Sequence, residues 1–305
     1  MYDIEAIFEA ESAEHAVELL NKHPQAHIIA GGSDVLIEIR EGKLSGCELV
    51  SIQKIDELRG VHIDSNGTLH IGSMTSISGV SSDPLIQKYI PVLVEACDTI
   101  GGPQLRNIAT IGGNICNGVT SADTASTLLA YDAVLEYLGP GGTRLVPIQE
   151  HYISAGKTAM AHNEILIEIL IPKESYENCF GNFIKYAMRN ALDIATIGCS
   201  ANIRLTEDKK QIERLRLAYG VAGPVPIRAP SVEQALAGKP VSGENQALTE
   251  SIAAAAKTVI NDINPRTSWR ASREFRLHLA EELAKRTITE SLQRAGVFPE
   301  NQKGD

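Results

Sequence analysis

The chain of 305 residues is 43% hydrophobic, 22% charged and only 5% aromatic, and its formal net charge is −10 at pH 7. This composition excludes an intrinsically disordered chain, and a chain of this length needs neither a metal nor a disulfide to hold its core. The acidic balance disfavours nucleic acid and anionic membranes as partners, because both attract clustered Lys and Arg, and the length predicts two domains.

The first nine residues carry acids where a signal peptide carries Lys or Arg, and no stretch reaches the roughly 20 apolar residues that span a bilayer. The five cysteines are widely separated, and the eight histidines form no spacing typical of a metal site. Iron–sulfur clusters and structural zinc need closely spaced thiolates. We therefore expect a cytoplasmic chain that has no metal of its own and buries its cysteines as small apolar residues.

Hydrophobic spacing and cap residues predict mixed helices and strands in the first 175 residues. In chain order they are a helix after Ser12, a strand over 27–30, an apolar element from Val35, strands over 49–52 and 68–73, a helix from Pro84 after Asp83, a strand over 108–111, a helix from 120–123 through Leu129, a hairpin of 133–138 and 143–148, and a strand over 164–171.

A polar stretch over 173–178 marks the predicted boundary between two domains. Beyond it, a meander of strands followed by helices predicts an α+β module with the helices on one face of an antiparallel sheet. The expected strands cover 183–188, 197–205 and 212–219, and the expected helices cover 231–237, 246–260 and 272–292. The predicted domains are 1–175 (subdomains about 1–58 and 59–175) and 176–295, with a tail over 296–305.

Two passages share one pattern, in which a predicted strand precedes two glycines and a small polar residue. They are Ala30-Gly31-Gly32-Ser33-Asp34 and Thr110-Ile111-Gly112-Gly113-Asn114. Paired glycines let the backbone approach a bulky ligand and turn N–H groups toward it, which suits the diphosphate of a dinucleotide. Two ordinary tight turns explain the same pattern, and neither passage matches the Rossmann or P-loop glycine motif.

Two charged residues allow two interpretations each. Asp123 either completes a helix cap or accepts a hydrogen bond from a ligand hydroxyl. Lys185 is either a surface lysine on a strand or a contact for an anionic ligand. The residues alone leave both alternatives open.

The motifs resemble the FAD-binding (medium) subunit of the molybdenum hydroxylases, and above all the bacterial xanthine dehydrogenase type. The resemblance rests on both diglycine passages, on the run Gln104–Asn114 (Q-L-R-N-I-A-T-I-G-G-N), on Lys185–Arg189 and on Trp269–Arg276. It covers nearly the whole chain in order. It implies an α+β fold, with a two-subdomain FAD-binding domain of the PCMH/vanillyl-alcohol-oxidase type followed by a smaller C-terminal α+β domain.

The resemblance also assigns binding roles. It implies that the two diglycine passages wrap the FAD diphosphate, that Asp123 binds ribityl or ribose hydroxyls, and that Leu166 and Lys185 lie near the isoalloxazine. Ile100 stands where relatives that use NAD carry an aromatic residue, which leaves the electron acceptor open. The cofactor-binding residues implied are Ile28, Ile29, Ala30, Gly31, Gly32, Ser33, Asp34, Val35, Ile100, Thr110, Ile111, Gly112, Gly113, Asn114, Thr120, Asp123, Leu166 and Lys185.

The function that the resemblance implies is electron transfer without a catalytic side chain. FAD is bound non-covalently, NAD+ is the expected co-substrate, and the molybdopterin and [2Fe–2S] clusters belong to a large and a small partner subunit. A dimer of heterotrimers active in purine metabolism is one assembly compatible with this.

Three other interpretations stay open at this point. The chain could serve a related hydroxylase, acting on nicotinate, carbon monoxide or another substrate with a different acceptor. It could be a self-sufficient flavin oxidase, although no substantial substrate-cap domain remains beyond the flavin domain. It could also be a non-catalytic nucleotide-binding scaffold. The substrate and the oligomeric state are not determined by the sequence.

Overall fold

The computed structural model describes residues 2–241 and 245–298 and divides the chain into two compact units. The first unit comprises the chain up to Val119 together with Ala133–Lys173, and the second comprises Thr120–Asp132 together with the chain from Glu174 onward. The domain boundary between 175 and 176 stays a prediction. Most of the predicted tail, residues 299–305, lies outside the described residues.

A three-stranded parallel sheet begins the first unit. β1 (Ile4–Glu9) and β2 (His27–Ile29) both pair with the central strand β3 (Cys47–Ser51). Between β1 and β2, helix α1 (Ala13–Lys22) begins where the Ser12 hydroxyl accepts the N–H of His15, which confirms the predicted cap. The apolar element predicted from Val35 is helix α2 (Val35–Arg40).

A five-stranded antiparallel sheet forms the larger part of this unit. Its order is β4 (Val61–Ile63), β5 (Leu69–Gly72), β10 (Ile165–Ile171), β6 (Val134–Gly139) and β7 (Gly142–Pro147). The remaining elements of the unit are η1 (Asp56–Leu58), α3 (Ile77–Ser82), α4 (Pro84–Tyr89), α5 (Pro91–Asp98), α6 (Pro103–Ile108), α7 (Ile111–Cys116), α9 (Ile148–His151), β8 (Tyr152–Ser154) and β9 (Lys157–Thr158).

The strand predicted over 108–111 is wrong, because two short helices meet there instead. Pro103 opens α6, where its missing N–H costs nothing. Thr110 caps α7 by accepting the N–H of Gly113 at 3.0 Å. The β-branched residues at 108, 110 and 111 favour a strand by composition, but these two helix-start signals determine the local structure.

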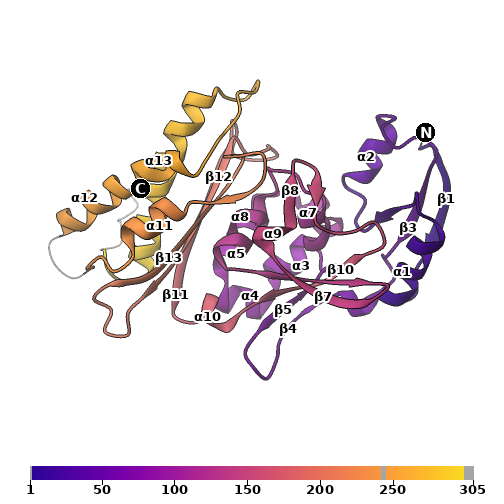
Figure 1. Cartoon of the computed structure of the whole chain (residues 1–305), viewed down its shortest axis with the longest axis horizontal. Helices are drawn as coiled ribbons and strands as arrows, with labels where there is room; N and C mark the ends of the chain where they lie inside the picture. Colours follow the sequence, from indigo (N-terminus) through magenta and orange to yellow (C-terminus); the bar gives the residue numbers. More distant parts are fainter. Residues whose placement is uncertain (1, 242–244, 299–305) are drawn as a thin grey trace. The chain divides into compact units, whose positions relative to one another are not determined.

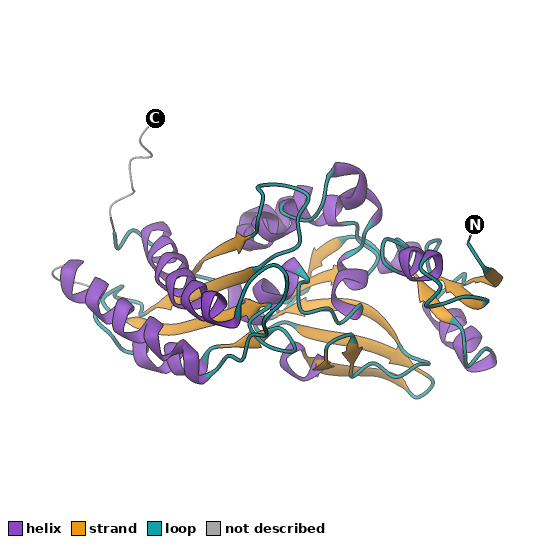
Figure 2. Cartoon of the chain, turned by 90° about the horizontal axis from the view of Figure 1, so that it is seen from above, coloured by secondary structure: helices purple, strands orange, loops and turns teal. Residues whose placement is uncertain are grey.

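The second unit is built on the antiparallel sheet β11 (Cys179–Tyr186), β12 (Ile197–Leu205), β13 (Ile212–Gly220) and β14 (Ile227–Arg228). Figure 1 shows helices α11 (Pro230–Leu236), α12 (Asn245–Ala256) and α13 (Arg273–Arg294) along one face of this sheet. Two short helices, α10 (Lys173–Tyr176) and η2 (Lys257–Asn261), complete the C-terminal part. Helices and strands occur together in both parts of the chain, which confirms the α+β class (Figure 2).

The sheet of the second unit is covered on both faces, not on one as the sequence predicts. Helix α8 (Asp123–Ala130) packs against β12 and β13. The amide of Asn202 donates to the carbonyl of Ala130 at 3.2 Å. Asn202 alternates along β12 with Ala201 and Ile203, which belong to the core shared with α11–α13, so α8 covers the opposite face.

Paired charges hold the end of α8 in the second unit. The Asp132 carboxylate bonds Nε of Arg216 at 2.9 Å and Nη1 of Arg228 at 2.7 Å. Arg228 also bonds Glu233 of α11, at 2.5 Å. Because Asp132 is 84 and 96 residues from Arg216 and Arg228 in the sequence, the network fixes residues 120–132 to the C-terminal sheet although their flanks belong to the first unit. Among the described residues, no helix has both the length and the apolar character needed to cross a bilayer.

One buried histidine makes the first unit sensitive to acid. His151 is fully buried, its Nε2 donates to the carbonyl of Ile115 at 3.1 Å, and its Nδ1 bonds the Tyr137 hydroxyl. Burial lowers the pKa of His151 from 6.5 to about 4, since a charged ring has no solvent there.

We expect this histidine to cost the folded protein about 3 kcal/mol of stability between neutral pH and pH 4. The sign follows from the pKa values, because the unfolded chain takes up the proton at a higher pH than the folded chain. In urea unfolding measured across that range, His151→Gln should weaken the dependence of the free energy of unfolding on pH. His162→Gln, at an exposed position, should leave the profile unchanged; a variant at 151 with the wild-type slope would contradict the assignment.

Candidate functional site

The first diglycine passage follows β2 and lies directly against the end of α6. A Cβ atom at Gly31 would fall on the carbonyl oxygen of Ile108 and close to Cα of Ala109. Only glycine permits this approach of the two backbones. The two diglycine passages, about 80 residues apart in the chain, are therefore brought together in the first unit.

The backbone of the first passage offers hydrogen-bond donors. None of the N–H groups of Gly31, Gly32 and Ser33 bonds an acceptor within the part of the chain that the structure describes. These three residues are half-buried, and no acceptor of the described chain takes up their N–H groups. Successive N–H groups of this kind bind anionic oxygens, so the passage fits the diphosphate of a dinucleotide.

The second passage differs, because its N–H groups bond within the chain. The N–H groups of Ile111 and Gly112 donate to the carbonyls of Thr75 and Ser73, at 3.0 and 2.9 Å. Gly112 also lies so close to this segment that an added Cβ would be 2.7 Å from the Ser73 carbonyl oxygen. The second passage is therefore held by Ser73 and Thr75, directly after the residues that Gly31 approaches. Its direct contact with a ligand stays a prediction.

Two further predicted residues of the first unit are buried. Leu166 lies on β10 opposite Tyr137, where a β-bulge follows, and is 4% exposed. Ile100 follows α5, and its carbonyl accepts Nη1 of Arg106 at 3.1 Å. Arg106 thus connects α6 to the loop that carries Ile100. The flavin contacts predicted for Leu166 and Ile100 stay predictions.

Three predicted residues lie together in the second unit. Asp123 is the first residue of α8 and accepts Nζ of Lys185, on β11, at 2.7 Å. Both side chains are at least nine-tenths buried. The N-cap of α8 is Ala122, without a side-chain cap, so the interpretation of Asp123 as a helix cap is wrong. The Thr120 carbonyl accepts the N–H of Val221 at 3.0 Å, which anchors the start of this segment.

The Asp123 carboxylate has unused bonding capacity. Its Oδ1 atom is buried and has no hydrogen-bond partner among the described residues. Burial raises the pKa of Asp123 to about 6, and the Lys185 ammonium opposes the rise. A buried acceptor without a donor is costly, and a ligand hydroxyl would satisfy it. The unpartnered Oδ1 atom favours the interpretation of Asp123 as a binding residue. It offers the acceptor that a ribityl or ribose hydroxyl needs.

Comparison with known proteins determines the family. The family model for the FAD binding domain in molybdopterin dehydrogenase matches residues 2–174, and that for the CO dehydrogenase flavoprotein C-terminal domain matches residues 182–291. The chain belongs to the FAD-binding subunits of the molybdenum hydroxylases. This family membership makes it an oxidoreductase subunit with an FAD-binding domain, and it confirms the resemblance seen in the sequence.

Individual relatives agree with the family over nearly their whole length. The xanthine dehydrogenase FAD-binding subunit of Escherichia coli O157:H7 is 42% identical over 296 residues, which cover 97% of this chain and 99% of that protein. The carbon monoxide dehydrogenase medium chain of Hydrogenophaga pseudoflava is 28% identical over 93% of this chain and 96% of its own. A solved structure of carbon monoxide dehydrogenase from Hydrogenophaga pseudoflava, 28% identical, matches with a TM-score of 0.88 and covers 96% of this chain and 99% of that one.

Sequence reasoning missed the backbone groups that shape the site. The carbonyl of Ile108 and the segment 73–75 hold the two glycine passages, yet main-chain atoms leave no side-chain signal. The pairing of Asp123 with Lys185 was also missed, since the two residues are 62 positions apart and meet only through the strand order of the second unit.

We predict that Gly31→Ala removes flavin from the purified protein. The added methyl group collides with the Ile108 carbonyl, so the passage must move, at a cost of about 1–3 kcal/mol in overpacking. The flavin-to-protein absorbance ratio and the urea unfolding midpoint measure both effects. The matched control is Gly141→Ala in the β6–β7 turn, where an added Cβ meets nothing within 4 Å; equal flavin content in both variants would contradict the assignment.

We predict that Lys185→Met destabilises the protein by about 3–5 kcal/mol, because it leaves the Asp123 carboxylate buried without its cation. The loss should shrink as the pH falls, since protonation neutralises the carboxyl. Urea unfolding of the single variant and of the Asp123→Asn/Lys185→Met double variant measures the coupling. The double variant should regain most of the stability, and strictly additive losses would show that the two groups act independently.

Proposed function

We propose that this chain is the FAD-carrying subunit of a xanthine dehydrogenase-like complex, in which electrons reach it from partner [2Fe–2S] clusters and leave to NAD+. The observation that carries the proposal is the 42% identity to a xanthine dehydrogenase FAD-binding subunit over 97% of this chain. Relatives named for carbon monoxide and nicotinate are 28% and 29% identical. The higher identity to the xanthine dehydrogenase subunit favours a purine over carbon monoxide or nicotinate as the substrate.

The proposal gives the residues of this chain a binding role. A bound FAD supplies the conversion between one-electron transfers and hydride transfer. Gly31, Gly32 and Ser33 would bind its diphosphate through their N–H groups, and the unpartnered Oδ1 of Asp123 would accept a sugar hydroxyl. The Lys185 ammonium favours the ionised form of Asp123, and Lys185 would lie near the ring system of the bound FAD. No side chain of this chain transfers a proton to or from the substrate.

The remaining cofactors belong to partners in this proposal. A large subunit carries molybdopterin and the purine pocket, and a small subunit carries the [2Fe–2S] clusters, so that the unit of assembly is a heterotrimer. The proposal is supported by relatives whose names describe a medium chain or an FAD subunit. It places the complex in the cytoplasm, where NAD+ is the available two-electron acceptor.

Anaerobic reduction of the purified chain tests the proposal. We expect a yellow protein whose flavin absorbance is bleached by NADH and not by xanthine, because the purine pocket lies on another subunit. Bleaching by NADH followed by reoxidation with NAD+ analogues would support the acceptor assignment.

Each alternative has its own outcome. A flavin that binds but is not reduced by NADH would replace NAD+ with another carrier. Turnover of a small substrate by the isolated chain would establish a self-sufficient oxidase. A colourless protein that does not take up FAD would leave only the nucleotide-binding scaffold.

A further inference from the structure

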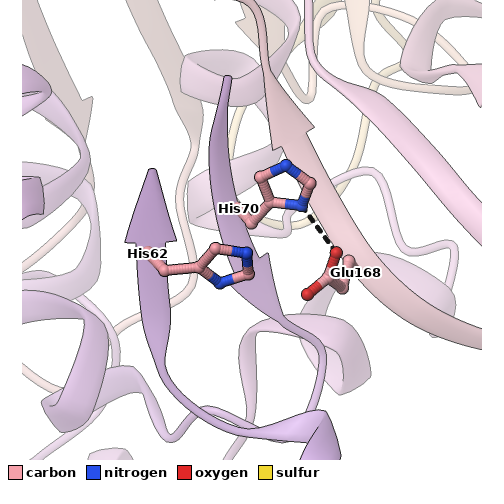
Figure 3. Close-up of side chains that lie close together, drawn as sticks. All are labelled: His62, His70 and Glu168. Carbon is pink, nitrogen blue, oxygen red and sulfur yellow. Dashed lines mark hydrogen bonds and ion pairs between the residues drawn. The ribbon is translucent and has the colours of Figure 1, made fainter. Parts of the chain in front are cut away.

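Two histidines and a glutamate meet on the outer face of the five-stranded sheet of the first unit. His62 lies on β4, His70 on β5 and Glu168 on β10, which are adjacent strands (Figure 3). Their ligand atoms all lie within 4.8 Å of one another. None of these residues belongs to the flavin site predicted above.

Strand register puts the three side chains on one face. His62 and His70 are directly paired across β4 and β5, and His70 is paired with Leu170 on β10. Glu168 precedes Leu170 by two residues and so shares its face. The alternate residues of β5, Leu69 and Ile71, are fully buried in the core, which leaves the cluster on the side toward solvent.

The geometry of the cluster suits a cation. The His70 Nδ1 atom is 2.6 Å from Glu168 Oε2, and the His62 ring stacks on the His70 ring with centroids 4.5 Å apart. Glu136 on β6 lies opposite Glu168 in the register. Two like charges in directly opposed positions destabilise a sheet, so a bound cation would relieve this repulsion.

A fourth residue lies beside the other nitrogen of the His70 ring. The Asp64 Oδ2 atom is 3.6 Å from His70 Nε2, a nitrogen that is buried and has no hydrogen-bond partner in the described chain. Asp64 is itself fixed, since its Oδ1 accepts the N–H groups of Asn66 and Thr68, both at 2.8 Å. A carboxylate behind a metal-bound histidine is the common arrangement in protein metal sites.

We propose that His62, His70 and Glu168 form a site for a divalent transition metal ion of the zinc class. The ligands are an imidazole nitrogen of His62, Nδ1 of His70 and a carboxylate oxygen of Glu168, and the fourth position is open to water. Two imidazoles and one carboxylate are a donor set that zinc accepts in tetrahedral geometry. Donor atoms in such a site are about 3.3 Å apart, so the 2.6 Å contact between His70 and Glu168 would open by about 0.7 Å and the exposed His62 side chain would rotate toward them.

A bound ion would stabilise the sheet that carries the site. Each ligand comes from a different strand, so a bound ion fastens the edge strand β4 to β5 and β10. Strand β5 leads directly into Ser73, whose carbonyl bonds Gly112 of the second diglycine passage. Metal binding therefore stabilises the segment that supports the first passage, without contributing a ligand to FAD.

Equilibrium dialysis of the tag-free protein against zinc chloride, followed by elemental analysis, tests the proposal. We expect one zinc ion per chain in the wild type and none bound specifically in His62→Gln or Glu168→Gln. His162→Gln, at an exposed histidine outside the cluster, should bind like the wild type. Asp64→Asn keeps the acceptor for Asn66 and Thr68 and should weaken binding about ten- to a hundredfold.

Thermal unfolding gives a second measurement that does not depend on activity. Zinc should raise the unfolding midpoint of the wild type and of His162→Gln, and it should leave that of His62→Gln unchanged. Since His62 is exposed, this variant should fold as the wild type does in the absence of metal. Stoichiometric zinc that persists in His62→Gln, or no zinc uptake by the wild type, would overturn the proposal.

Discussion

The close approach of Gly31 to the carbonyl of Ile108 is the contact on which the candidate site depends. It brings the end of β2 against the end of α6, and it can exist only because residue 31 lacks a side chain, since a Cβ there would meet backbone atoms. Around it, the backbone of residues 109–112 is joined to residues 73–77 by three hydrogen bonds, two of which form an antiparallel bridge between Ser76 and Thr110. The N–H groups of Gly31, Gly32 and Ser33 bond no acceptor in the described chain, as a site for anionic oxygens requires.

The two glycine passages are similar in sequence but differ in the hydrogen bonds of their N–H groups. In the first one, the N–H groups bond nothing within the described chain, whereas those of the second bond Ser73, Thr75 and Thr110. The second unit contributes a buried ion pair, Asp123 with Lys185, in which one carboxylate oxygen remains unsatisfied. In the proposed function, both features would bind and orient FAD. This agrees with a subunit whose chemistry resides in its cofactor.

Local signals in the sequence predicted much of the fold. Ser12 and Asp83 predicted helix starts that the structure confirms, and β12 has the bounds 197–205 that were expected. The prediction of a strand over 108–111 is wrong because the Thr110 side chain caps a helix that begins there. The resemblance also identified the family. Contacts between distant segments could not be predicted, because the pairing of His70 with Glu168, or of Asp123 with Lys185, depends on strand order and register.

The most direct test of the central claim is the composition of the native complex that contains this chain. Affinity purification from the native source, followed by flavin, iron and molybdenum analysis, measures it. The account predicts two co-purifying chains, FAD in equal amount to this chain, and iron and molybdenum that remain with the partners when the complex is dissociated. Purification of this chain without partners, with bound flavin but no molybdenum and with substrate oxidation by the chain alone, would contradict the account.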